Sequence, residues 1–267
     1  MKRILALSLN TFREAIRNKI LYVLLFFGVA VIASALALGQ MSLNEESRIT
    51  RDVGLGGMLL FGVLIAIFVG VNLVYKELDR KTVFALIPKP IHRWEFIFGK
   101  YLGMVMTLAV LVAIMTAVLF GVLALQHLAT GAANDVAPVV RAIVLTFVEL
   151  AVVTAVAVLF SSFSTPLLSG AFTLGLFVVG NFTPELRELI SRAGGGATRG
   201  ALFAGLRLFP DLHLFSVSGS MLGGQYVSVH GAFVDWSYVA LASGYGAFYS
   251  GCALALAMIL FSRRDFV

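Results

Sequence analysis

Long, continuous apolar runs separated by short polar segments dominate this chain. Each of six runs approaches or exceeds the roughly 20 residues that a helix needs to cross the roughly 30 Å hydrocarbon core of a bilayer. The runs do not alternate with period two, which excludes membrane β-strands. The pattern therefore predicts an all-α integral membrane protein, a single domain over residues 1–267. Its six predicted transmembrane helices cover residues 20–38, 55–74, 101–125, 139–160, 166–182 and 236–261.

The segment before the first run, residues 1–19, is amphipathic. Leu5, Leu9, Phe12 and Ile16 recur at helical spacing, and basic residues lie off that stripe. Such a helix lies in the membrane interface, with its cations at the headgroups. We predict an elbow helix that positions the first span; the alternative is a merely charged flank.

Composition supports the membrane interpretation. Of the 267 residues, 60% are hydrophobic and 13% are charged, against roughly 25% charged in soluble domains. The net charge of +6 comes from basic residues beside the spans, so we expect no nucleic-acid binding. The positive-inside rule places both termini and the loop over residues 75–100 in the cytoplasm.

The loop over residues 75–100 is basic and interrupted by prolines. Pro88 and Pro90 break any helix there, and a new helix is predicted to begin near Arg93 and continue into the third span. The aromatic residues Phe84, Trp94 and Phe96 are unusual for a bland surface loop. These features predict a short coupling helix, between the first two spans and the third, that a soluble partner can push.

A long segment on the opposite side, residues 183–235, is not uniformly polar. Thr183 is predicted to cap a helix that begins with Pro184, and residues 226–230 alternate like a short strand. We expect this extracytoplasmic segment to be folded. It either handles an outer partner or substrate release, or packs as a cap over the bundle.

Candidate chemistry is sparse. The chain has no phosphate-binding loop, and no two of its four histidines have helical ligand spacing. The one cysteine, Cys252, is expected to be a small buried residue. Glu149, in the fourth predicted span, is the clear intramembrane ionisable group; it is either functional or hydrogen-bonded at a helix or dimer interface. Asn72 and Asn181 are assigned to hydrogen bonds near span ends.

The loop resembles the first cytoplasmic loop of permeases of type-2 ATP-binding-cassette exporters. The pattern that carries the resemblance is Glu77, Arg80-Lys81-Thr82, Pro88, Pro90, Arg93, Glu95 and Gly99-Lys100. Pro90 is additional to the family pattern, and Thr82 lacks a preceding glycine, which affects the helix boundaries. A shorter stretch, residues 208–215, is similar to permeases of copper-enzyme (nitrous oxide reductase) maturation.

The resemblance implies a permease subunit in the cytoplasmic (inner) membrane of a prokaryote, paired with a second permease copy as a homodimer or heterodimer. Two copies of a separate ATPase subunit would bind ATP and Mg, so this chain would hold no cofactor or metal and have no catalytic residue. The resemblance implies ATPase-coupling roles for these residues: Glu77, Arg80, Lys81, Thr82, Pro88, Pro90, Arg93 and Glu95. Headgroup contact is the alternative for the basic ones.

Three functions stay open at this point. The first is the membrane subunit of an exporter driven by ATP hydrolysis in the partner. The second is a force-transmitting subunit that acts on an extracytoplasmic partner without moving substrate itself. The third is an ATPase-independent channel or carrier, which would need more polar residues in the spans than Glu149, Asn72 and Asn181 provide. The sequence does not identify a substrate.

Overall fold

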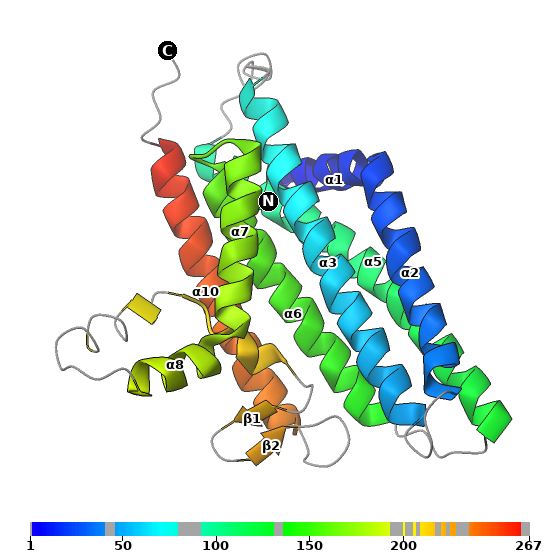
Figure 1. Cartoon of the computed structure of the whole chain (residues 1–267). Coiled ribbons are helices and arrows are strands. Elements are labelled where there is room, and N and C mark those ends of the chain that lie inside the picture. Colours follow the sequence, from blue (N-terminus) through cyan, green and yellow to red (C-terminus); the bar gives the residue numbers. More distant parts are fainter. Residues whose placement is uncertain are drawn as a thin grey trace.

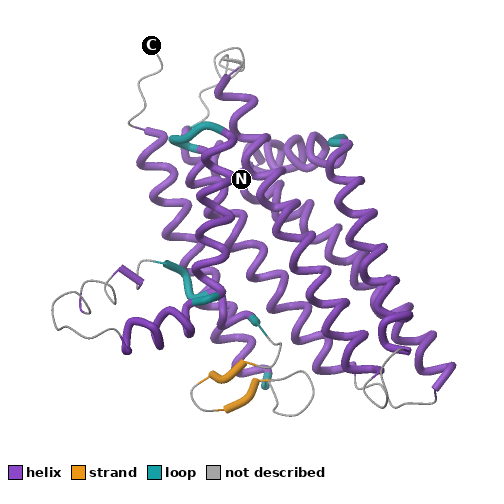
Figure 2. The backbone as a smooth tube through the Cα atoms, in the orientation of Figure 1, coloured by secondary structure: helices purple, strands orange, loops and turns teal. Residues whose placement is uncertain are grey.

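The computed structural model describes residues 2–40, 46–79, 92–130, 136–192, 200, 205–206, 209–216, 220–222, 225–227 and 235–262. The protein is a helical bundle (Figures 1 and 2), as the apolar runs predict. The helices are α1 (Lys2–Ile16), α2 (Lys19–Gln40), α3 (Glu46–Asp79), α5 (Arg93–Thr130), α6 (Val136–Ser161), α7 (Pro166–Asn181), α8 (Thr183–Arg192) and α10 (Trp236–Ser262). A 3-10 turn, η1 (Leu212–Phe215), and a small hairpin, β1 (Ser220–Leu222) with β2 (Gln225–Val227), lie between α8 and α10.

Five helices in the described part of the chain are long and apolar enough to cross a membrane, namely α2, α3, α5, α6 and α10. A sixth span exists if α7 and α8 count as one, but these two helices are bent by 68°. Pro184 explains the bend, because proline lacks an N–H and its ring clashes with the carbonyl four residues earlier. The fifth predicted span is therefore a short helix followed by a sharp turn.

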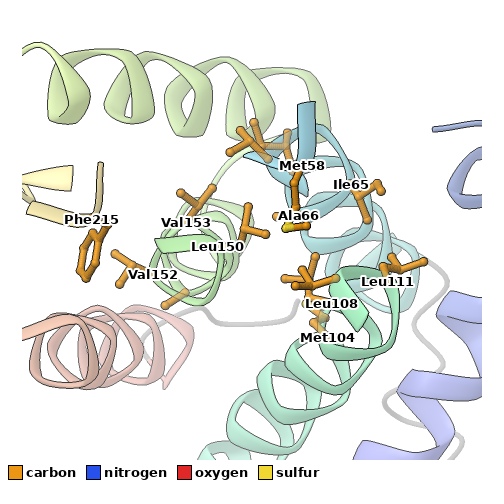
Figure 3. Close-up of a cluster of buried hydrophobic side chains, with 14 of the residues drawn as sticks. Met58, Ile65, Ala66, Met104, Leu108, Leu111, Leu150, Val152, Val153 and Phe215 are labelled. Carbon is orange, nitrogen blue, oxygen red and sulfur yellow. The ribbon is translucent and has the colours of Figure 1, made fainter. Parts of the chain in front are cut away.

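The centre of the bundle is formed by α3 and α6. In the most apolar part of each helix, 61% of α3 and 67% of α6 is buried inside the bundle, whereas only 22% of α2 is. Figure 3 shows Ile65 and Ala66 of α3 facing Leu108 of α5, with Leu150 of α6 close by. Gly62 permits this approach, because a Cβ there would lie 2.6 Å from Leu150 Cδ1.

Four buried threonines of α5, α6 and α7 form hydrogen bonds within their own helix. The hydroxyls of Thr107, Thr146, Thr154 and Thr173 donate to the carbonyl four residues earlier, at 2.7 to 3.0 Å. Each of these threonines therefore enters an apolar bundle without an unpaired donor.

The first helix lies crosswise at one end of the bundle (Figure 1), which we call the α1 end. At this end α3, α6 and α10 finish and α5 and α7 begin, whereas α8 and the β-hairpin lie at the opposite end, the α8 end. Asn18 separates α1 from α2, since its Oδ1 accepts the Ile20 N–H at 3.1 Å. The face of α1 that packs on the bundle carries Ser8, Thr11 and Ala15, and the predicted apolar stripe with Leu5 faces outward.

Two local expectations are wrong. Thr183 does not cap α8 with its side chain; its hydroxyl donates back to the carbonyls of Val179 and Gly180, because α7 ends only two residues before it. Cys252 is exposed rather than buried, because the span of α10 is only 33% buried. The predicted strand over residues 226–230 is described only in part, as β2.

Candidate functional site

The predicted coupling loop is helical at both of its ends. Residues 75–79 continue α3 and residues 93–100 begin α5, so Glu77 and Arg93 lie on the two helices that flank the loop. Arg80, Lys81, Thr82, Pro88 and Pro90 lie outside the described residues. Both of these helix ends lie at the α1 end of the bundle (Figure 1).

Glu95 has a local role at the start of α5. Its Oε2 accepts the backbone N–H of His92 at 3.1 Å, and the His92 carbonyl accepts the Phe96 N–H at 3.3 Å. A glutamate in the first turn that reaches back in this way satisfies an amide that the helix leaves unpaired. Glu95 therefore fixes where α5 begins, directly after the loop.

A second polar feature lies within the bundle. Glu149 of α6 is 1% exposed, and its Oε1 accepts a hydrogen bond from Asn181 Nδ2 at 3.1 Å. Asn181 Nδ2 also donates to the Phe177 carbonyl at 3.2 Å. An amide donor thus partly offsets the cost of burying this carboxyl group. Asn181 thus forms a hydrogen bond at the end of α7, as the sequence predicts for a polar residue near a span end, and its partner is Glu149.

The depth of this pair follows from the α6–α7 hairpin. Glu149 lies about 18 Å along α6 from its end at Ser161, taking 1.5 Å per residue. Asn181, the last residue of α7, reaches that same level. Beyond it α7 no longer covers α6, and a different segment takes its place.

That segment is residues 209–216, which we call the cap segment. Leu212 and Phe215 within it are 0% and 1% exposed. Leu212 packs on Gly180, where an added Cβ would lie 2.8 Å from Leu212 Cγ. Phe215 packs near Val152 of α6 (Figure 3) and against Gly246 of α10. The cap segment thus occupies the space beyond the end of α7.

Hydrogen bonds to its backbone hold the cap segment in place. Tyr238 Oη donates to the Leu214 carbonyl at 2.6 Å, and Tyr245 Oη accepts the Asp211 N–H at 3.0 Å. An ion pair of 3.0 Å joins Arg187 of α8 to Asp211. The sequence predicted folding in residues 183–235 but gave no indication of these two tyrosines, which lie in an apolar helix.

The start of α10, which follows the cap segment and the β-hairpin in the chain, is fixed by Asp235. Its carboxylate accepts the Ser237 hydroxyl and the Trp236 N–H, both at 2.8 Å. These two bonds lower the pKa of Asp235. The capping charge at the first turn of α10 also suits the positive end of the helix dipole.

We expect Glu149→Ala to lower the free energy of unfolding by about 0.5–1.5 kcal/mol, because it removes the hydrogen bond to the half-buried Asn181 amide, which keeps the Phe177 carbonyl as an acceptor. Glu149→Gln keeps an acceptor oxygen and should unfold close to wild type. Denaturant titration in detergent micelles measures both. The matched control is Glu188→Ala, which removes an exposed carboxylate paired with Arg192 on α8 and should have little effect. Equal stability of Glu149→Ala and wild type would contradict the role of the pair.

Among the described residues, no group of three or more His, Cys, Asp or Glu side chains could hold a metal ion. The described arrangement is thus a bundle with one buried carboxyl–amide pair, a packed cap at one end, and two long helices projecting toward a basic loop at the other.

Comparison with known families agrees with this architecture. The model of a family described as ABC-2 family transporter protein matches residues 5–266, nearly the whole chain. No curated protein matches the sequence. The matched region includes α5, α6, α7, α10 and the segments between them. This chain, with its multiple apolar helices, therefore belongs to the ABC-2 transporter family and is a multi-pass membrane permease of an ATP-binding-cassette transporter.

Proposed function

We propose that this chain is the permease subunit of an exporter whose transport is powered by ATP hydrolysis in a separate ATPase docked on residues 75–100. One observation carries the proposal. Helix α3 ends just before the basic part of this loop, α5 begins just after it, and both helices run through the bundle. A push on the loop reaches the central helix α3 and the long helix α5 at once.

In this proposal the partner binds ATP and Mg, and the present chain contributes no catalytic group. Two ATPase copies and two permease copies form the transporter in the prokaryotic inner membrane, with the α1 end in the cytoplasm. The outward stripe of α1, including Leu5 at 60% exposed, suits a helix lying on the membrane surface as an elbow.

The test is ATPase stimulation in nanodiscs. The wild-type chain and a Glu77→Ala/Arg93→Ala variant are each reconstituted with the candidate ATPase, and hydrolysis is measured with and without the permease. We expect the variant to lose complex formation or to lower stimulation by at least about fivefold, a typical size for coupling between sites.

The matched control is Arg48→Ala/Asp52→Ala, which removes an exposed pair from the opposite end of α3. An exposed pair of this kind contributes little to stability, so stimulation should persist. Wild-type coupling in Glu77→Ala/Arg93→Ala would show that these residues are not the contact. If no ATPase bound the wild-type chain, the exporter proposal would fail.

The cap segment favours one second candidate, a subunit that transmits force to an extracytoplasmic partner. Arg187 and Asp211 tie α8 to the cap segment, and Tyr245 ties the cap segment to α10, so movement of α10 is passed to the α8 end. Substrate movement into proteoliposomes distinguishes the two: an exporter transports, whereas a force-transmitting subunit hydrolyses ATP without transport.

A further inference from the structure

The first three turns of α5 are packed tightly against α1. An added Cβ at Gly99 would lie 2.8 Å from Leu7 Cδ2, and one at Gly103 would lie 2.6 Å from the Ser8 carbonyl oxygen. Distances under 3.0 Å require a neighbour to shift. This side of α5 therefore cannot move toward α1 without displacing it.

Lys100 occupies a different side of the same turns. It follows the loop by only a few residues, yet its side chain is 1% exposed and is among the largest fully buried side chains described. Lys100 is the last residue of the predicted loop over residues 75–100, and the structure places it within α5. Its Nζ lies 5.1 Å from the centroid of the Phe96 ring.

The surroundings of Lys100 come from two other helices. Lys100 lines a small cavity with Val158 and Ser162, at the end of α6, and with Phe261, in the last turn of α10. Phe96 also stacks on Phe261, with ring centroids 5.9 Å apart and an interplanar angle of 16°. The buried ammonium thus lies where the start of α5 meets the ends of α6 and α10.

Electrostatics favour a cation at this position. The last carbonyl groups of a helix carry partial negative charge, and α6 and α10 both end here, at Ser161 and Ser262. Burying an ammonium is costly unless charges or dipoles compensate it. Two helix C-termini supply such compensation, and the interaction weakens if α5 separates from either helix.

We propose that Lys100 is a positioning residue that couples the start of α5 to the ends of α6 and α10, so that a displacement of the loop moves all three together. The inference rests on the proposed function, since it concerns how a push on the loop spreads. The stacking of Phe96 on Phe261 packs α5 against α10. The attraction between Lys100 and the C-terminal ends of α6 and α10 keeps the three helices together.

The first experiment compares Lys100→Met with Lys100→Arg in the reconstituted complex. Methionine keeps much of the volume, and replacing a buried charge by an apolar residue is often tolerated, so we expect Lys100→Met to fold and to bind the ATPase. We expect its stimulated hydrolysis to fall by at least about fivefold, whereas Lys100→Arg, which keeps the charge, retains more of it. Thermal unfolding of each variant shows whether stability changes in parallel.

The second experiment measures movement directly. Spin labels at Trp94 and Ile259, which are 49% and 50% exposed, report the distance between the start of α5 and the end of α10 in a Cys252→Ser background. We expect the distance to stay constant on ATP binding with Lys100, and to change with Lys100→Met because α10 no longer follows.

The outcomes separate the two proposals. If Lys100→Met bound the ATPase and hydrolysed ATP like wild type, with an unchanged label distance, Lys100 would have no coupling role and the exporter proposal would stand. Loss of stability to the same extent in Lys100→Met and Lys100→Arg, with wild-type stimulation per folded complex, would also overturn the inference. If the wild-type chain bound no ATPase, the exporter proposal and this inference would both fall.

Discussion

Replacing Phe215 by alanine is expected to lower the free energy of unfolding by about 3–5 kcal/mol, the usual range for a buried phenylalanine. Phe215 is 1% exposed and packs between α6 and α10. Its removal leaves a cavity that Val148, Val152 and Tyr245 cannot fill without moving. Denaturant or thermal unfolding in detergent micelles measures the change.

Phe209→Ala is the matched control, because it makes the same substitution in the same cap segment at a side chain that is 39% exposed. We expect it to cost well under half as much, since exposed substitutions usually change stability by only about 0.5 kcal/mol. If the two variants had equal stability, the cap segment would not be packed on the bundle as described.

The second large effect is expected at Gly103, where α1 crosses α5. A Cβ there would lie 2.6 Å from both the Ser8 carbonyl oxygen and Thr11 Cβ. Gly103→Leu forces the helices apart, at a cost of about 1–3 kcal/mol for overpacking. Each 1.4 kcal/mol is a factor of ten, so amide hydrogen exchange in α1 should accelerate by about fivefold to a hundredfold.

Gly121→Leu provides the control on the same helix. An added Cβ at Gly121 would meet nothing within 4 Å, and leucine is a better helix former than glycine by nearly 1 kcal/mol. Exchange in α1 should therefore match wild type. Equal acceleration in both variants would mean that the effect belongs to α5 as a whole and not to its contact with α1.

Hydropathy located the spans but not the ends of the helices. The second predicted span covered residues 55–74, whereas α3 extends over Glu46–Asp79. Backbone hydrogen bonds continue through polar residues, and hydropathy marks only the part suited to lipid. The fifth predicted span, residues 166–182, matches α7 (Pro166–Asn181) to within one residue. Pro184, which predicts a helix start, lies in the first turn of α8.

The site was predictable where a single residue carries the signal. Glu149 is conspicuous as a carboxyl group in an apolar run, and the structure buries it. Asn181 as its partner requires knowing that α6 and α7 form a tight antiparallel hairpin, in which residues at similar distances from the turn meet. Tyr238, Tyr245 and Lys100 require the three-dimensional arrangement, because their partners come from segments distant in the chain.

The packing of α1 on α5 also imposes an order on biosynthesis. Ser8 and Thr11 of α1 pack against Gly103, and Leu7 packs against Gly99. The ribosome adds these two glycines much later than α1. At typical rates of about 5–20 residues per second, the interval is on the order of ten seconds. During that time α1 has no α5 to dock on, so the nascent chain completes the layer at the α1 end only after the start of α5 has been synthesised.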